Sequence, residues 1–215
     1  PICVSGEGWP ERLLDRLARL HLLLEAARRL EALPSDLQEE VRSQIGWVAD
    51  QEALRSQPGR RDRWAVVGRR ISDDGSLRVQ RTWLWGLEGG GAALVLDFAP
   101  AGRPLESSLA PGTYLEGELV FFPGPFPWRA LVKGQHGAKP LASLNGYASL
   151  RAALTAYGGA LARNPWLDRL LLPLAGVIPV GQGSRWAVSD ANGHELPLRL
   201  PANEGWRLVA LSGGR

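Results

Sequence analysis

One short stretch of this chain alternates arginine with tryptophan in a pattern suited to ligand contact. Residues 77–85 read LRVQRTWLW. On a β-strand, alternation places Arg81 and Trp83 on the same face. An arginine flanked by tryptophans on a sheet surface offers cation–π contacts and a stacking platform for nucleic-acid bases. The candidate contact residues for a partner or a nucleic acid are Arg60, Arg61, Arg63, Arg78, Arg81 and Trp83.

The charges around this stretch have two interpretations. Residues 55–81 carry eight arginines against three aspartates, and residues 86–126 carry one arginine against five carboxylates. In the functional interpretation, the basic half binds phosphate or an acidic partner. In the structural one, basic and acidic strands lie side by side and pair, each surface pair contributing about 0–1 kcal/mol. The net charge of +3 is too small to favour the first.

No group of residues in the sequence indicates catalysis. Glu116 and Glu118 are two apart on one expected strand, where we interpret them as a solvated face. The glycine-rich residues 86–91 lead from one strand into another, so no helix N-terminus is available for a phosphate. We expect no enzyme and no cofactor, and the weaker alternative is a site assembled from scattered residues.

Metal binding is also not indicated. The chain has one cysteine, Cys3, and three widely spaced histidines. One cysteine cannot form an internal disulfide, and histidines without cysteine partners do not build the usual structural zinc site. We expect His136 and His194 on the surface and His21 partly buried on a helix.

The first 58 residues have helical periodicity. Apolar side chains recur every three or four residues from Pro10 to about Ala32, and Pro34 ends that helix. A second helix has one apolar face, formed by Leu37, Val41, Ile45 and Val48, and is closed by Pro58. Residues 1–58 are therefore predicted to form an αα-hairpin.

Between residues 59 and 140 the apolar period becomes two. Turn sequences rich in Asp, Pro and Gly separate the expected strands, with no helix between them. This spacing predicts an antiparallel β-meander or a small barrel. The expected strands are Trp64–Arg69, Leu77–Trp85, Ala92–Phe98, Tyr114–Phe122 and Trp128–Lys133.

Residues 141–215 are predicted to form short helices and a β-hairpin unit. Helical spacing covers Leu150–Leu161, and a short helix is expected around Trp166–Leu171. The tail is expected to be β again, with strands at Gly176–Val180, Arg185–Val188, Glu195–Leu200 and Trp206–Leu211. The fold class is therefore α+β, either in three parts or as one continuous domain. Core positions are expected for Trp64, Trp83, Trp85, Trp128, Trp186 and Trp206.

The composition is that of a folded protein. Hydrophobic residues make up 45% and charged residues 22% of the 215. No apolar run reaches the ~18 residues needed to span a bilayer, and the N-terminus has no signal-peptide pattern. A cytoplasmic location without membrane contact is expected. The unusual start and end of the sequence suit a fragment of a longer protein.

Four segments resemble the region C-terminal to the zinc finger in bacterial SWIM zinc-finger proteins. They read LHLLLEA at 20–26, RVQRTWLWG at 78–86, LVFFPG at 119–124 and ARNPWL at 162–167. The family's finger has the signature C-x-C…C-x-H, which a chain with Cys3 alone does not contain. No zinc ligand is carried over, therefore. The resemblance implies a module beside a finger that mediates DNA or protein interaction.

The sequence thus predicts a non-catalytic α+β module, an αα-hairpin packed on a β-meander or small barrel and followed by a helix and β-hairpin unit. Its expected role is protein interaction or scaffolding within a bacterial SWIM zinc-finger protein. The alternative is a nucleic-acid-binding module that uses the Arg- and Trp-rich β surface. The protein partner and the oligomeric state are left open.

Overall fold

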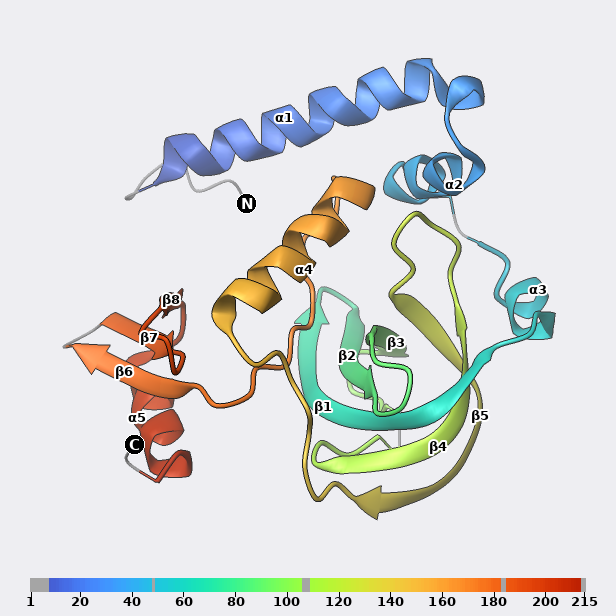
Figure 1. Cartoon of the computed structure of the whole chain (residues 1–215). Coiled ribbons are helices and arrows are strands. Elements are labelled where there is room, and N and C mark those ends of the chain that lie inside the picture. The colour runs from blue at the N-terminus through green and yellow to red at the C-terminus, as the bar shows by residue number, and fades with distance from the viewer. Residues whose placement is uncertain (1–7, 48, 106–108, 183–184, 214–215) are drawn as a thin grey trace.

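The structure, a computed structural model, describes residues 8–47, 49–105, 109–182 and 185–213. Four helical elements come first, then five strands, one helix, three short strands and a last helix (Figure 1). The helices are α1 (Trp9–Arg28), η1 (Leu30–Ala32), α2 (Ser35–Gln44), α3 (Gln51–Ser56), α4 (Leu150–Arg163) and α5 (Ala202–Leu211). The strands are β1 (Arg60–Asp74), β2 (Leu77–Gly86), β3 (Ala92–Pro100), β4 (Thr113–Phe121), β5 (Arg129–Pro140), β6 (Ile178–Gln182), β7 (Arg185–Ser189) and β8 (Glu195–Leu198).

The first five strands close into a barrel in the order β1-β2-β3-β5-β4. All neighbours are antiparallel except β3 and β5, which pair in parallel. The α+β class and the small barrel are confirmed, whereas a simple meander order is wrong, because β5 lies between β3 and β4. The arrangement is that of a five-stranded Greek-key barrel of the OB type.

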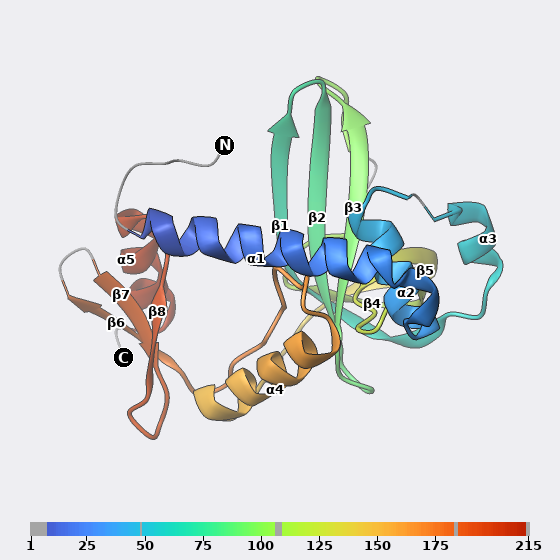
Figure 2. The same ribbon diagram turned by 90° about the horizontal axis from the view of Figure 1, so that it is seen from above.

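Strand β1 is long enough to pair with β4 near its start and with β2 over the rest of its length. Its residues 60–65 pair with β4, and its residues 64–74 pair with β2, with a register shift between Val66 and Gly68. Past the part of β1 that pairs with β4, residues 68–74, 77–83 and 94–100 form a three-stranded sheet that we call the arm. At its base, residues 94–95 also pair with β5 in the barrel. Figure 2 shows the arm projecting away from the rest of the molecule.

The barrel interior is apolar and centred on Trp64, which is fully buried. Its indole N–H donates to the Gly117 carbonyl at 3.2 Å, so the ring's one polar group has a partner. The ring lies 6.0 Å from that of Phe121, centroid to centroid. The buried residues of this cluster are Trp64, Val66, Leu84, Ala93, Val95, Leu109, Leu115, Leu119 and Ala130.

The N-terminal helices differ in whether they bury side chains against the rest of the protein. Leu54 of α3 packs with Val120 and Leu131 of the barrel, and Val41 of α2 is fully buried. Helix α1 buries none of its residues. The predicted second helix is in fact two, because it ends at Gln44 and a new helix begins at Gln51, capped by the Asp50 side chain.

His21 on α1 is exposed, so the prediction that it is partly buried is wrong.

Helix α1 contacts residues far along the chain through Arg19. The Arg19 carbonyl accepts from the Trp166 indole at 3.3 Å, and its guanidinium pairs with Asp168. None of the helices in the described residues combines the length and apolarity that crossing a bilayer requires.

Helix α4 buries Leu150, Ala153 and Ala160. Its first turn is tied to the C-terminal unit, because the Leu150 amide donates to the Asp190 carboxylate at 3.0 Å. The short helix predicted at 166–171 is absent. Asn164 instead bonds the Trp166 amide at 3.0 Å in a turn, and the chain that follows has no regular structure.

The C-terminal unit is a three-stranded antiparallel sheet, β6-β7-β8, with α5 packed against it. Residues 206–211 are helical, so the strand predicted there is wrong. The buried Trp186 ring fits against Gly181 and Gly205, where an added Cβ would lie 2.5 and 2.0 Å from ring atoms. Trp206 meets that ring edge-on at 5.2 Å but is 67% exposed, which corrects its predicted core position.

Candidate functional site

The predicted contact residues fall into two groups on the structure. Arg60, Arg61 and Arg63 lie at the start of β1, where it pairs with β4. The other three, Arg78, Arg81 and Trp83, lie on β2 within the arm. These two groups occupy different parts of the barrel and differ in what surrounds their cations.

Every arginine of the first group is paired with a carboxylate of this chain. Arg61 pairs with Glu118 at 3.2 Å and Arg63 with Glu88 at 2.9 Å. Arg60 pairs with Asp62 at 2.9 Å and lies over the Trp64 ring, 4.8 Å from its centroid. These cations therefore bind the loop after β2 and strand β4 to the start of β1.

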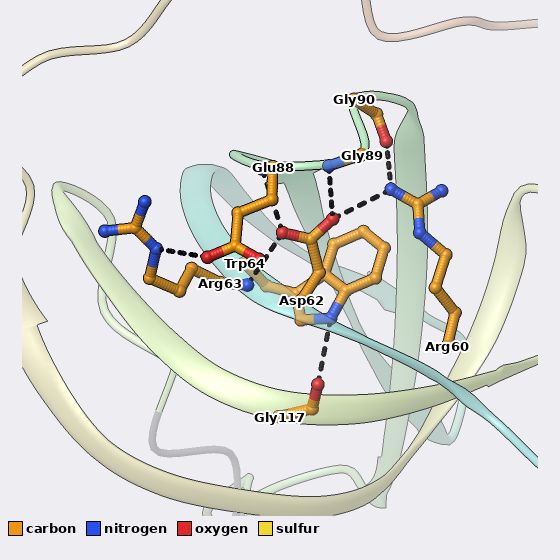
Figure 3. A network of polar contacts seen from close by, with 8 residues as sticks. All are labelled: Arg60, Asp62, Arg63, Trp64, Glu88, Gly89, Gly90 and Gly117. Carbon is orange, nitrogen blue, oxygen red and sulfur yellow. Dashed lines mark hydrogen bonds and ion pairs between the residues drawn. The ribbon is translucent and has the colours of Figure 1, made fainter.

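Asp62 is the centre of this arrangement (Figure 3). Its side chain is 2% exposed and accepts from the Arg63, Glu88 and Gly89 amides at 2.7, 3.0 and 3.0 Å, besides its bond to Arg60. Burial alone raises a carboxyl pKa, but these hydrogen bonds and the guanidinium outweigh it and lower the pKa of Asp62 below its usual value. The Asp62 carboxylate is therefore stabilised in its ionised form, and its role is structural.

A shallow hollow beside this network is lined by charged and polar side chains, among them Arg61, Arg63, Glu116, Glu118 and His136. Glu118 accepts from the Gly59 amide and pairs with Lys133 and Arg61, and these contacts lower its pKa. Glu116 pairs with Lys139 at 3.2 Å. Glu116 and Glu118 thus form ion pairs that join β4 to the neighbouring strands. Among the described residues, no cluster of three potential metal ligands occurs.

The arm presents a different surface. Cross-strand register places nine residues on one face in three rows, which we call the arm face. The row nearest the barrel holds Gly68, Trp83 and Leu94, the middle row Arg70, Arg81 and Leu96, and the outer row Ser72, Val79 and Phe98. Arg78 is on the opposite face, where it pairs with Asp73 at 2.9 Å.

Two arginines of the arm face oppose each other directly, since Arg70 is the register partner of Arg81. Arg81 donates to the Ser72 hydroxyl at 2.8 Å, and neither guanidinium pairs with a carboxylate among the residues that the structure describes. Arg70 and Phe98 are exposed, Phe98 by 52%. The arm face thus combines unneutralised cations with an open aromatic ring.

The sequence analysis counted Arg70 among the arginines of residues 55–81 but placed neither it nor Leu96 nor Phe98 on this face. The signal for Arg70 was present, because Asp74 and Leu77 flank a two-residue turn and fix the hairpin register that brings it to Arg81. Phe98 required the pairing of β3 with β2, which is set by a longer loop.

Comparison with known proteins gives one match. Residues 1–45 match the family model of the SWIM-associated four-helix bundle domain. This confirms, over those residues, the resemblance to the region C-terminal to a SWIM zinc finger. Searches of curated proteins and of solved structures give no match. The match thus covers the N-terminal residues up to the end of α2, and the barrel and the C-terminal unit lie outside it.

Proposed function

We propose that this chain is a non-catalytic protein-interaction module, and that α1 is its contact surface. The observation that carries the proposal is an apolar stripe of which half or more remains exposed among the residues that the structure describes. Leu14, Leu17, Leu20 and Leu24 recur at helical spacing and are 68, 53, 52 and 52% exposed. Figure 1 shows α1 along the outer edge of the molecule.

An apolar stripe this exposed is unusual for a helix whose apolar face is packed against the rest of its protein. Helix α4, which is shorter, buries three residues, whereas α1 buries none over its 20. Contiguous exposed apolar surface of this extent typically marks an interaction site. We therefore expect the stripe to be covered in the assembled protein.

The family description suggests what covers it. The matched domain is a four-helix bundle, and the described residues of the matched region contain two α-helices, α1 and α2. A second copy of the chain would supply two more. Most homodimers are symmetric, with the same patch on both subunits, and a single leucine stripe per chain suits that geometry. We take the second copy as the occupant.

The experiment is sedimentation equilibrium of the 23.3 kDa chain from about 1 to 100 µM, concentrations that bracket micromolar association. We expect twice the monomer mass at the upper end. Leu17→Glu should return the protein to a monomer, because it buries a charge in the stripe. Leu22→Glu is the matched control: Leu22 is also exposed but lies roughly 140° around the helix from Leu17.

A monomer throughout the concentration range would contradict the second copy as occupant. Equal loss of the dimer in both variants would contradict the stripe as the contact surface. Circular dichroism of each variant checks that the helices are retained.

A further inference from the structure

The charges of the arm are separated between its two faces. Asp73, Asp97 and Arg78 lie on the face opposite the arm face, where Arg78 pairs with Asp73 and Gln80 bonds Asp97 at 3.3 Å. Of the nine residues on the arm face, two are arginines and none is acidic. An anion approaching this face meets two cations and, among the side chains that the structure describes, no carboxylate on the face itself.

The Arg70–Arg81 pair is unfavourable for the fold by itself. Like charges directly opposite on neighbouring strands repel and destabilise a sheet. At the start of the same strand, Arg61 and Arg63 each face a glutamate and gain a partner. A cross-strand arginine pair without a carboxylate is accounted for if a ligand supplies the negative charge.

Each of the two rows beside the arginines contains one aromatic residue. Trp83 is half-buried and lies across Gly68, where an added Cβ would be 3.5 Å from the ring. Phe98 is on the outer row with 52% of its surface open. The two rings are four residues apart along the strands, roughly 13 Å at the usual rise. They therefore flank the arginines on both sides.

We propose that the arm face binds single-stranded nucleic acid, with Arg70 and Arg81 on the phosphates and Phe98 and Trp83 stacked on bases. Base stacking on aromatic side chains needs bases that are not paired in a duplex, which favours a single strand. A phosphate alone would use the arginines but not the rings. Barrels of this topology bind oligonucleotides in other proteins, but the argument rests on the nine residues of this face.

The arm projects from the barrel, so the ligand has access from the side. Figure 2 shows the ends of β1, β2 and β3 standing clear of α1 and α4. Phe98 and Arg70, the most exposed members of the face, lie in the rows away from the barrel. A strand running along the outer and middle rows would contact both without displacing any element of the fold.

The test is fluorescence anisotropy with labelled 15-nucleotide oligo(dT), oligo(rU) and a 15-base-pair duplex, at about 50 and about 200 mM salt, where phosphate contacts weaken strongly. We expect wild-type protein to bind at least one single strand more tightly than the duplex. Phe98→Ala should weaken binding roughly tenfold, the value of one stacked base. Comparing the affinities for oligo(dT) and oligo(rU) shows whether DNA or RNA is preferred.

The arginines are tested with a matched pair of double variants. Arg70→Ala/Arg81→Ala should weaken binding at least tenfold and lower the salt dependence by about one to two phosphate contacts. Arg61→Ala/Arg63→Ala removes the same charge from the same barrel and should retain more than half of the affinity. Thermal unfolding of both variants shows whether the barrel is intact.

Three results would overturn the proposal. One is the absence of binding at about 50 mM salt. Another is competition by inorganic polyphosphate or polyglutamate as strong as by unlabelled oligonucleotide, because that would assign the face to bare anions or acidic peptides. The third is equal loss in the two double variants, which would mean that total charge and not this face binds the strand.

Discussion

The arginines in the two halves of strand β1 have neighbours of opposite charge. Near its start, Arg60, Arg61 and Arg63 are each paired with a carboxylate. Ten residues further along, Arg70 faces Arg81 across the strand pair with no carboxylate among the described residues. The first half is an internal ion-pair network, and the second half is an open cationic surface.

The difference shows that a cluster of arginines does not by itself mark a binding site. Arginine is suited both to joining strands through carboxylates and to binding phosphate, and the neighbouring strand determines which role it takes. Strand β4 brings Glu118 to Arg61, whereas β2 brings Arg81 to Arg70. The partners across the sheet, and not the density of charge along the chain, separate the two halves.

The largest expected effect is the loss of Asp62. Asp62→Ala removes a buried carboxylate that accepts from three backbone amides and from Arg60. Those donors lose their partner inside the protein, so the free energy of unfolding should fall by about 3 kcal/mol. Urea denaturation measures it. A loss below about 1 kcal/mol would show that the loop after β2 does not depend on this residue.

A smaller effect is expected with pH. The pKa of Asp62 is lowered in the folded state, so its stabilisation is complete above the unfolded pKa, about 3.9, and is lost as pH falls through the lower folded value. The difference in unfolding free energy between wild type and Asp62→Asn should therefore shrink from pH 6 towards pH 2. Asp190 and Glu118 also have lowered pKa values, and both are common to the two proteins. A difference independent of pH would contradict the ionised role of Asp62.

The smallest effect is expected at Arg61. Its side chain is 87% exposed, and its partner Glu118 keeps the Gly59 amide and Lys133 when Arg61 is removed. Arg61→Ala should change the unfolding free energy by no more than about 0.5 kcal/mol. A larger loss in urea denaturation would mean that the pair contributes as a network with Lys133.

The sequence predicted the local elements of this fold well, because their periodicity is local. The leucine spacing of α1 and the alternation of β2 each identify the element. The order of strands in the barrel was not predictable in this way. The parallel pairing of β3 with β5 joins residues 94–95 to 129–130, and no local pattern reports such a contact.

The errors in the C-terminal region also have a physical cause. The strand was predicted at residues 206–211, where the apolar run is too short for periodicity alone to separate a strand from a helix. The helix packs closely on Trp186 at Gly205, which has no side chain, and this contact joins residues that are 19 positions apart. Likewise, the arginines were predicted as candidates, but their pairing depends on which strand lies beside them.

The most direct measurement compares Arg60→Ala with Arg70→Ala by urea denaturation. Arg60 bonds Asp62 and the Gly90 carbonyl and lies over Trp64, so its removal should cost about 1 kcal/mol. Arg70→Ala relieves a like-charge pair and should leave the unfolding free energy unchanged or raise it by a few tenths of a kcal/mol. Equal losses in the two variants would contradict the account, because Arg70 would then stabilise the fold as Arg60 does.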